Sequence, residues 1–417
     1  MSDHAFVWVW LPGATDPVVA GRVQQQVQAG RPASYSFTYG RSYLQNPRAV
    51  PLLAELPMEQ GVQMPASGLE IAGVLLDATP DSWGRRVINE RVLGARTRQS
   101  EPADLDLLTY MLRSGSDRIG ALDFQTSATE YIARNAEHQA TLDELMDAAA
   151  LIEKGEALSP AIADALFLGS SVGGARPKAS LIDGGRSLIA KFPSTTDQYP
   201  IVKYEGVAME LARRVGITTA KTEVRHTAGR DVLIVERFDR PGDGTRMMQV
   251  SALTILGVNP ETARGATSYP AVADKIRSSF TQPRAALSEL FARIVFNVIV
   301  RNTDDHARNT AAFWDGHALT LTPAYDITPS HGRRDSIASH PMAIDVDGDN
   351  QSLLAVCIDA AAAYLLSNEE AQEIVDRQVD LVREEWRDAA DTARLTTRER
   401  DALWETSILN PAIFWER

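Results

Sequence analysis

The sequence has 417 residues, of which 44% are hydrophobic and 23% are charged, and this composition is typical of a globular protein with about two or three domains. Its 42 basic and 55 acidic residues give a formal net charge of −13, which argues against a free-standing nucleic-acid binder but allows a local basic patch. The single cysteine, Cys357, excludes a disulfide framework and a cysteine-based zinc or iron–sulfur site within one chain. The first residues lack the pattern of a signal peptide and no stretch has the length of an apolar membrane span, so we expect a cytoplasmic protein.

The first 127 residues predict a mixed α/β domain. Residues 6–11 are aromatic-rich, and residues 35–39 alternate between aromatic and small polar side chains, as half-buried strands do. A helix is predicted after Asp81, a good N-cap residue, and a second helical pattern covers residues 101–115. The polar run at 126–140 then predicts a linker.

The rest of the sequence predicts a strand-rich segment followed by a helical one. Residues 128–240 hold several short β-like runs, interrupted by a helical pattern at 205–216. Residues 241–417 are mostly helical, and the clearest helix begins at Ser367, which has capping-box spacing with Glu370. We therefore predict an α+β fold with three parts, residues 1–127, 128–240 and 241–417.

The most informative stretch for chemistry follows a strongly apolar helix predicted over 287–300. The polar loop after it places Asp304 and Asn309 at the D-x-x-x-x-N spacing of protein-kinase catalytic loops, and Asp326 follows a hairpin-like turn. Phosphoryl transfer needs a carboxylate that accepts the proton of the attacking hydroxyl, and separate oxygen ligands for magnesium. The pattern favours Asp304 as the base and Asn309 and Asp326 as the metal ligands.

Other interpretations of this loop stay open at this point. Aspartate and asparagine are common in solvated turns. A lone histidine such as His306 more often forms hydrogen bonds to loop backbone than acts as a base. A metal-dependent hydrolase is a third interpretation, although the two-histidine spacing of zinc hydrolases is missing. Such a hydrolase would be built on Asp304, Asp305, His306 and Asp326.

Elements that bind a nucleotide are predicted upstream, in the order in which a kinase has them. Residues 169–178 form a Gly-rich loop, in which glycines let backbone N–H groups approach phosphate. Lys191 ends a strand, as the phosphate-binding lysine of kinases does, and Glu205 lies on a helix that could present its carboxylate to that lysine. The strand 231–235 leads into residues 236–240, where a kinase has the hinge whose backbone contacts adenine. A surface lysine and a surface glutamate are the alternative for single residues, so it is the order of the elements that favours a kinase.

These motifs resemble the HipA family of bacterial serine/threonine kinases. The resemblance is carried by residues 171–178, 189–193, 235–240, 302–309 and 324–327, and in the N-terminal part by 35–39, 79–84 and 117–121. The Gly-rich loop reads Gly-Gly-Ala-Arg-Pro-Lys rather than Gly-Ala-Gln-Glu-Lys, and Asp305 and Arg308 stand where other members carry Gly and Lys. The family implies a two-lobed protein-kinase-like fold with an N-terminal α/β subdomain and a mostly helical C-terminal lobe.

The resemblance also implies ATP and Mg²⁺ as cofactors, with Asp304 as the catalytic residue and Asn309 and Asp326 as metal ligands. The nucleotide-binding residues that it implies are Ser171, Val172, Gly173, Gly174, Ala175, Lys191, Glu236, Phe238, His306, Asn309 and Asp326. It further implies autophosphorylation of Ser171, in preference to Ser170, where the added negative charge would repel the phosphates of ATP.

In biological terms the resemblance implies the toxin of a toxin–antitoxin module. Such a toxin is held in check by a small HipB-like helix-turn-helix antitoxin, and the pair binds operator DNA mainly through that complex. An aminoacyl-tRNA synthetase is a candidate for the protein substrate. The alternatives are a small-molecule kinase and a weakly catalytic corepressor scaffold for the antitoxin.

Overall fold

The computed structural model describes residues 3–27, 30, 33–93, 105–135, 140–156, 158, 162, 166–167 and 174–416. The chain forms two compact units. Unit 1 consists of Met1–Asp197, His226–Val250 and Trp314–His317, and unit 2 of Gln198–Arg225, Ser251–Phe313 and Ala318–Arg417. Each unit therefore combines segments that are distant in sequence. No helix among the described residues is long and apolar enough to cross a membrane.

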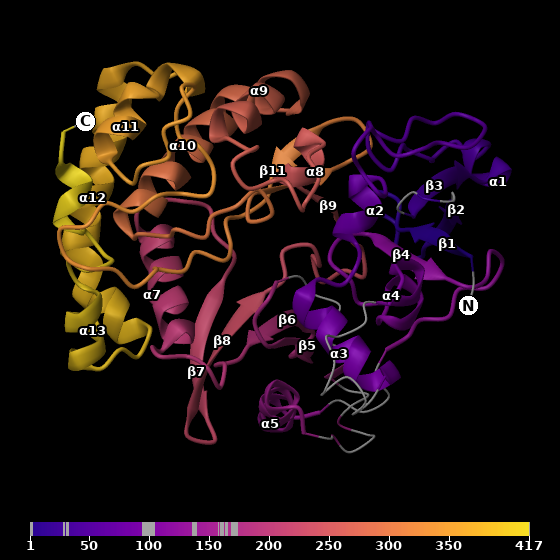
Figure 1. Cartoon of the computed structure of the whole chain (residues 1–417), viewed down its shortest axis with the longest axis horizontal. Coiled ribbons are helices and arrows are strands. Elements are labelled where there is room, and N and C mark those ends of the chain that lie inside the picture. The colour runs from indigo at the N-terminus through magenta and orange to yellow at the C-terminus, as the bar shows by residue number, and fades with distance from the viewer. Residues whose placement is uncertain are drawn as a thin grey trace. The chain divides into compact units, whose positions relative to one another are not determined.

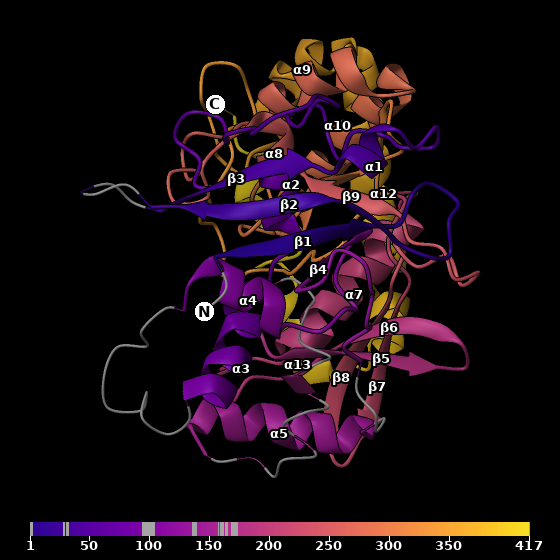
Figure 2. The same cartoon turned by 90° about the vertical axis from the view of Figure 1, so that its right-hand side faces the viewer.

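Unit 1 begins with a four-stranded antiparallel sheet in the order β3-β2-β1-β4 (Figure 2). Its strands are β1 (His4–Val9), β2 (Val18–Gln26), β3 (Ser34–Tyr39) and β4 (Leu122–Gln125). The helices of this part are α1 (Arg41–Leu44), α2 (Gly73–Asp77), α3 (Ser82–Leu93) and α4 (Leu107–Arg113). The predicted cap of α3 is confirmed, because the Asp81 carboxylate accepts a hydrogen bond from the Gly84 backbone N–H at 3.3 Å.

A second antiparallel sheet in unit 1 pairs β5 (Lys178–Asp183) with β6 (Arg186–Lys191), and β6 with β8 (Arg230–Glu236). The helix α5 (Leu142–Lys154) starts with the Thr141 capping box. One buried core joins α3 and α5 to this sheet, and Trp83, Phe167 and Phe192 are among its residues. The burial of α3 against the strands explains how an element from the N-terminal segment supports the second sheet.

The segment predicted as a linker contains no helix or strand over its described residues 126–135 and 140. It is nevertheless tied to the first sheet. The Tyr131 hydroxyl donates to Asp123 at 3.1 Å, and the Arg134 guanidinium lies 2.9 Å from the same carboxylate. The boundaries of the three predicted domains stay predictions.

Unit 2 is mostly helical, as expected. Its helices are α7 (Ile201–Arg214), α8 (Ala252–Leu256), α9 (Tyr269–Ser279), α10 (Pro283–Ile299), α11 (Leu354–Asp359), α12 (Asn368–Thr392) and α13 (Thr397–Leu403), with 3-10 turns at Ala361–Tyr364 and Pro411–Phe414. The strands β7 (Thr222–Thr227) and β9 (Met248–Ser251) lie where the chain passes from one unit to the other, and β10 (Ala311–Trp314) and β11 (Leu319–Leu321) form the predicted hairpin.

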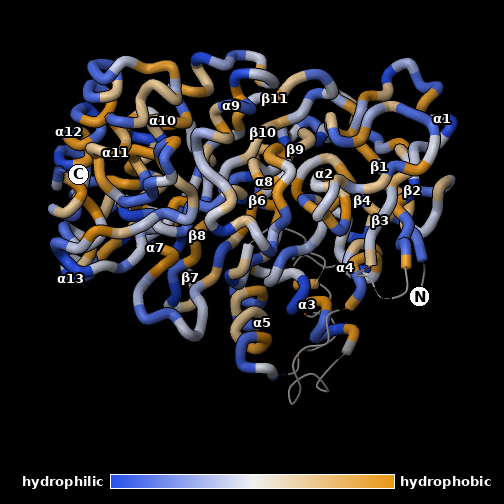
Figure 3. Tube along the Cα trace, turned by 45° about the horizontal axis from the view of Figure 1, so that its top comes forward, coloured by the Kyte–Doolittle hydropathy of each residue, from blue (hydrophilic) through white to orange (hydrophobic). Residues whose placement is uncertain are grey.

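The apolar helix α10 is the centre of unit 2. Ten of its residues between Leu287 and Ile299 are buried, including the charged Arg293 and the polar Asn297. Every residue from Arg293 to Ile299 is buried, so this end of the helix is enclosed on all sides. The long helix α12 lies against α7 and α10 (Figure 1), and the Gln378 side-chain amide donates to the Ala292 carbonyl at 2.9 Å. Hydrophilic and hydrophobic segments alternate along α12 (Figure 3), as in a helix with one buried face, and its predicted capping box is present.

Candidate functional site

The loop after α10 is fixed to the end of that helix by buried side chains. The Asn302 backbone N–H donates to the Asn297 carbonyl at 2.8 Å, and its side-chain Nδ2 donates to Asn297 Oδ1 at 3.0 Å. Asn297 Nδ2 in turn donates to Asp305 Oδ2 at 2.7 Å. Because these groups are buried, their hydrogen bonds hold the loop rigidly against the end of the helix.

Asp304 and Asn309, predicted from their spacing, are brought together by hydrogen bonds within the loop. Asn309 Nδ2 donates to the Asp304 carbonyl at 3.0 Å, so its Oδ1 oxygen can serve as a metal ligand. The His306 backbone N–H donates to the same carbonyl at 2.9 Å. The side chains of Asp304 and His306 are exposed, whereas Asp305 between them is buried. The loop therefore presents its predicted base to solvent.

Asp326 directly follows two residues that hydrogen bonds hold in place. Before it, Ala324 exchanges backbone hydrogen bonds with Thr218 and Ala220 at 2.8 and 2.9 Å, and the Tyr325 hydroxyl donates to the Arg308 carbonyl at 2.7 Å. Asp326 itself has a φ of 61°, a left-handed conformation that is uncommon for a residue with a side chain. Such conformations concentrate at functional sites, where the surrounding structure enforces them.

A buried cluster behind the catalytic loop was not predicted from the sequence. The Tyr269 hydroxyl donates to Asp305 Oδ2, the oxygen that also accepts from Asn297. Burial raises the pKa of Asp305 to about 6, and the charge of Asp326 adds to this rise, whereas the Tyr269 hydroxyl, His306 and Arg293 work against it. Asp326 is thus one of the charges that act on this buried carboxylate.

In unit 1, Lys191 has a second lysine beside it. Lys178 on β5 and Lys191 on β6 are direct partners in the antiparallel ladder, so both side chains leave the same face of the sheet. The pair concentrates positive charge on one face of the sheet, a position that would favour an anion such as phosphate. Lys178 thus joins the candidate phosphate-binding residues.

The signal for Lys178 is present in the sequence. Gly184 and Gly185 have positive φ values of 57° and 77° in the two-residue turn between β5 and β6. A Gly-Gly turn fixes the hairpin register, and counting outward from it pairs Lys178 with Lys191. Lys178 is thus found by counting back along β5 from the turn.

The Gly-rich loop is described from Gly174 onward, so the predicted residues Ser170, Ser171, Val172 and Gly173 lie outside the described residues. Gly174 has a φ of 117°, and a Cβ atom there would lie 1.8 Å from Lys178 Nζ. The positive φ favours glycine at this position, whereas the lysine ammonium is the end of a flexible side chain and can move away from a Cβ atom. Ala175 is exposed next to it.

The helix α3 supports the strand that carries Lys178. The indole N–H of Trp83 donates to the Lys178 carbonyl at 2.8 Å, and both residues are buried. A buried N–H needs such a partner, so this bond fixes where β5 begins relative to α3. An N-terminal residue thereby positions a candidate phosphate-binding lysine.

The predicted hinge continues the ladder beyond β8. The Arg237 backbone N–H donates to the Ser187 carbonyl at 2.9 Å, one residue after the strand ends at Glu236. The side chains of Glu236 and Phe238 are half-buried, whereas those of Arg237 and Asp239 are buried. The backbone on either side of Phe238 is therefore held in place.

The predicted site residues are divided between the two units. Unit 1 holds the described part of the Gly-rich loop, Lys191 and the hinge, and unit 2 holds Asp304, His306, Asn309 and Asp326. Glu205, the predicted partner of Lys191, is buried on α7 in unit 2. Among the described residues, no group of three or more His, Cys, Asp or Glu side chains is arranged to hold a metal ion. A magnesium site here would rest on Asp326 and the Asn309 amide oxygen, together with phosphate oxygens.

Comparison with known proteins identifies the family. Residues 170–386 match the model of the HipA-like C-terminal domain, and residues 14–125 match that of the HipA N-terminal domain. The Y4mE protein of Sinorhizobium fredii, which carries a provisional kinase name, is 29% identical over 334 residues, covering 74% of this chain and 75% of that protein. The serine/threonine-protein kinase toxin HipA of Shewanella oneidensis is 27% identical over 212 residues, covering 44% of this chain and 49% of the toxin.

The solved structure of a HipA protein from Shewanella oneidensis MR-1, in complex with HipB and operator DNA, superimposes with a TM-score of 0.68 at 18% identity. The match covers 98% of this chain and 100% of that one, and it confirms the predicted α+β, HipA-like fold. Since the C-terminal family model alone matches more than half of the residues, this chain belongs to the HipA family.

Proposed function

We propose that this chain is an ATP- and Mg²⁺-dependent protein serine/threonine kinase. The observation that carries the proposal is the closed catalytic loop, in which Asn309 binds the backbone of Asp304 and the loop is fixed to a buried helix through Asn302. Kinases named among the relatives support the same activity. Positioning a base and the metal ligands on a rigid element is what phosphoryl transfer chiefly requires.

Each candidate residue has a role in this proposal. The exposed Asp304 carboxylate accepts the proton of the attacking hydroxyl, and Asn309 and Asp326 supply oxygen ligands. Bound there, Mg²⁺ would neutralise charge on the transferred phosphoryl group. Lys178 and Lys191 hold phosphate oxygens, and His306 lines the nucleotide site. The hinge backbone at Glu236 and Phe238 contacts adenine.

We also propose that the kinase modifies its own Gly-rich loop. Ser171 is the preferred acceptor over Ser170, and Val172, Gly173, Gly174 and Ala175 complete the loop that cradles the phosphates. A phosphate on Ser171 adds about −1.5 to −2 charges beside the phosphates of ATP, so it lowers ATP affinity. Mass spectrometry after incubation with ATP and magnesium tests this modification.

The proposed biological setting is a toxin–antitoxin module in the cytoplasm. HipA of Shewanella oneidensis MR-1 is found in complex with HipB and operator DNA. We propose that this chain likewise restrains growth as a toxin, pairs with a HipB-like helix-turn-helix antitoxin, and reaches operator DNA mainly through it. Its net charge of −13 favours contact with DNA through a partner. An aminoacyl-tRNA synthetase is a candidate for its protein substrate.

The proposed chemistry is tested by Asp304→Asn. This variant keeps a polar side chain of the same size, so we expect ATP binding close to that of the parent and ATP turnover lower by about 10² to 10⁴. Asp401→Asn, which changes an exposed carboxylate on α13, is the matched control and should keep full turnover. Full turnover by Asp304→Asn would place the base elsewhere, and a folded parent that neither binds nor consumes ATP would refute the kinase proposal.

A further inference from the structure

A cluster of buried ion pairs in unit 1 joins residues 117–120 to the hinge, and the phosphoryl-transfer chemistry proposed above does not use it. We name this cluster, formed by Asp117, Arg237, Asp239 and Arg240, the hinge clamp. We propose that the hinge clamp sets the backbone of the hinge and so determines the selection of adenine. This inference rests on the proposed kinase function, and it makes the four residues positioning residues for nucleotide binding.

The Arg237 guanidinium connects the two segments directly. Its side chain is fully inaccessible to solvent, with Nη1 2.8 Å from Asp117 Oδ1 and Nη2 2.8 Å from Asp239 Oδ2. Its Nε donates to Asp239 Oδ1 at 3.0 Å, so the Arg237–Asp239 pair is bidentate. Nη2 also donates to the Arg118 carbonyl at 2.7 Å. The planar guanidinium thus fixes the direction of both segments at once.

The backbone of the N-terminal segment takes part in the clamp as well. Arg240 Nη1 donates to the Gly120 carbonyl at 2.9 Å and to Asp239 Oδ2 at 2.7 Å. The Gly120 N–H donates to the same carboxylate oxygen at 2.8 Å. Gly120 has a φ of 78°, and a Cβ atom there would lie 3.2 Å from the Gln249 backbone nitrogen. The positive φ and the nearby Gln249 backbone both favour glycine at this position of the clamp.

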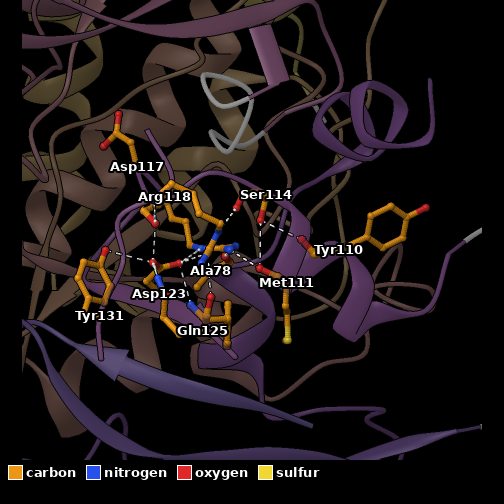
Figure 4. Close-up of polar contacts among 12 residues, drawn as sticks. Ala78, Tyr110, Met111, Ser114, Asp117, Arg118, Asp123, Gln125 and Tyr131 are labelled. Atoms are coloured by element: carbon orange, nitrogen blue, oxygen red, sulfur yellow. Dashed lines mark hydrogen bonds and ion pairs between the residues drawn. The ribbon is translucent and has the colours of Figure 1, made fainter. Parts of the chain in front are cut away.

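The segment that holds the hinge is itself anchored. Figure 4 shows Arg118 among polar groups of Asp123 on the first sheet, of Ala78 at the end of α2 and of Met111 on α4, whereas the side chain of Asp117 points away from this group. Arg118 Nε donates to Asp123 Oδ1 at 2.7 Å and Nη1 donates to the Ala78 carbonyl at 3.1 Å. Adjacent residues therefore face opposite ways: Arg118 locks the segment into the first sheet, and Asp117 faces the hinge.

The charges of the hinge clamp balance, with two arginines against two aspartates. Burial opposes the ionisation of Asp239, but Arg237 and Arg240 outweigh it and hold the pKa of that carboxyl well below its usual range. Buried ion pairs of this kind add little net stability compared with an apolar replacement, because desolvation offsets the attraction. What they supply is direction, since each bond is made only at one relative placement of the two segments.

The placement matters because Phe238 lies between the held residues Arg237 and Asp239, and Glu236 directly precedes them. On one side the Arg237 backbone is bound to Ser187 of β6, and on the other the Arg237 and Asp239 side chains are bound to residues 117–120. The peptide groups that would read the edge of adenine are therefore fixed from both sides. A shift of the hinge by a fraction of an ångström weakens the hydrogen bonds between the hinge and adenine, whereas it leaves the bonds to the triphosphate unchanged.

The test compares nucleotides that differ in their base. Asp117→Asn removes a partly exposed partner, and Arg237→Lys keeps the charge while losing the bidentate fork. Calorimetric titration should show that either variant binds ATP about tenfold more weakly than the parent, a loss equivalent to about one or two hydrogen bonds to the base. The ratio of the affinities for ATP and GTP should fall by a similar factor. Affinity for inorganic tripolyphosphate should be unchanged, and kcat at saturating ATP should stay within about threefold of the parent. Asp147→Asn breaks a surface ion pair of unit 1 with Arg230 and is the matched control.

Several outcomes overturn the inference. One is a folded Asp117→Asn or Arg237→Lys protein with the parent's ATP-to-GTP ratio, and another is equal loss of affinity for ATP, GTP and tripolyphosphate, which a merely structural role would give. A parent that binds ATP and GTP equally overturns it too. If the folded parent binds neither nucleotide, the proposed kinase function is itself wrong, and the role of the hinge clamp falls with it.

Discussion

At the scale of single residues, Asp305 shows how the catalytic loop is held. Its carboxylate accepts hydrogen bonds from Tyr269 and Asn297, which come from two different helices. The side chain is buried, and burial raises its pKa to about 6. At neutral pH the loop therefore contains a buried negative charge directly beside the proposed base. Burying this charge lowers the stability of the fold, while its hydrogen bonds hold the loop in one conformation.

The first prediction concerns the pH dependence of stability at Asp305. Because its pKa of about 6 in the folded chain lies above the ordinary 3.8, the folded chain binds this proton more tightly than the unfolded chain. The stabilising contribution is complete below about pH 4 and is lost as the pH rises through about 6. The Asp305→Asn variant has no titrating group at this position, so its stability does not fall in this way. Its free energy of unfolding relative to the parent should therefore increase by about 1 to 2 kcal/mol between about pH 5 and pH 7.5. Thermal melting at both pH values measures it, and a constant difference would contradict the assigned pKa.

A second prediction separates the phosphate-binding cation from the metal ligand. Lys191→Met removes a charge proposed to hold phosphate, so ATP affinity should fall by about tenfold and added magnesium should not restore it. Asp326→Asn removes a proposed metal ligand, so the magnesium concentration for half-maximal turnover should rise. Magnesium titrations of both variants measure this. Rescue of Lys191→Met by magnesium, with no effect on Asp326→Asn, would reverse the two roles.

At the scale of elements, the site depends on helices and strands that carry none of its reactive groups. The helix α10 fixes the catalytic loop through Asn297, and α3 fixes the start of β5 through Trp83. In each case a polar side chain on a helix satisfies a buried group in the loop or strand that carries a candidate site residue. Loss of such a bond leaves a buried partner unsatisfied and costs about 1 to 3 kcal/mol.

The third prediction tests this support at Trp83. Trp83→Phe removes the indole N–H that donates to the Lys178 carbonyl, so the melting temperature of unit 1 should fall and ATP affinity should decrease several-fold. Trp8→Phe removes a similar bond, from Trp8 to the Ser127 carbonyl at 3.0 Å, and is the matched control. It should lower stability without changing ATP affinity. Equal ATP affinities in the two variants would show that α3 does not position Lys178.

The elements were predictable from the sequence to different degrees. The apolar run of α10 and the capping box of Ser367 and Glu370 were sufficient for those helices, and the spacing of Asp304 and Asn309 was sufficient for the loop. The role of Asn297 was not predictable, because an asparagine within an apolar helix does not reveal which loop residue it meets. The hinge clamp was missed for the same reason: ion pairs between residues about 120 positions apart depend on tertiary packing.

At the scale of the whole molecule, the negative net charge favours DNA binding through a partner protein. A chain with a net charge of −13 repels DNA over most of its surface, and specific DNA affinity comes largely from cations that neutralise phosphates. Membership in the HipA family, together with the HipB and operator DNA bound to a HipA of the same fold, motivates the proposed antitoxin.

The fourth prediction follows from that charge balance. The purified chain alone should show little affinity for operator DNA at physiological salt, whereas its complex with the antitoxin should bind tightly and with a steep dependence on salt. Electrophoretic mobility or fluorescence anisotropy with and without the antitoxin measures the difference. Tight, salt-sensitive binding by the chain alone would refute the proposed division of labour.

The central claim, protein phosphorylation by Asp304 chemistry, is tested most directly by following the γ-phosphate of labelled ATP. Purified parent chain, magnesium and labelled ATP are added to a nucleotide-depleted lysate of the source organism, and label is counted separately in protein and in small molecules. The account predicts that label enters serine or threonine of protein, that Asp304→Asn reduces this transfer by about 10² or more, and that a magnesium chelator abolishes it. Label found only in small molecules, or transfer by Asp304→Asn equal to that of the parent, would contradict the account.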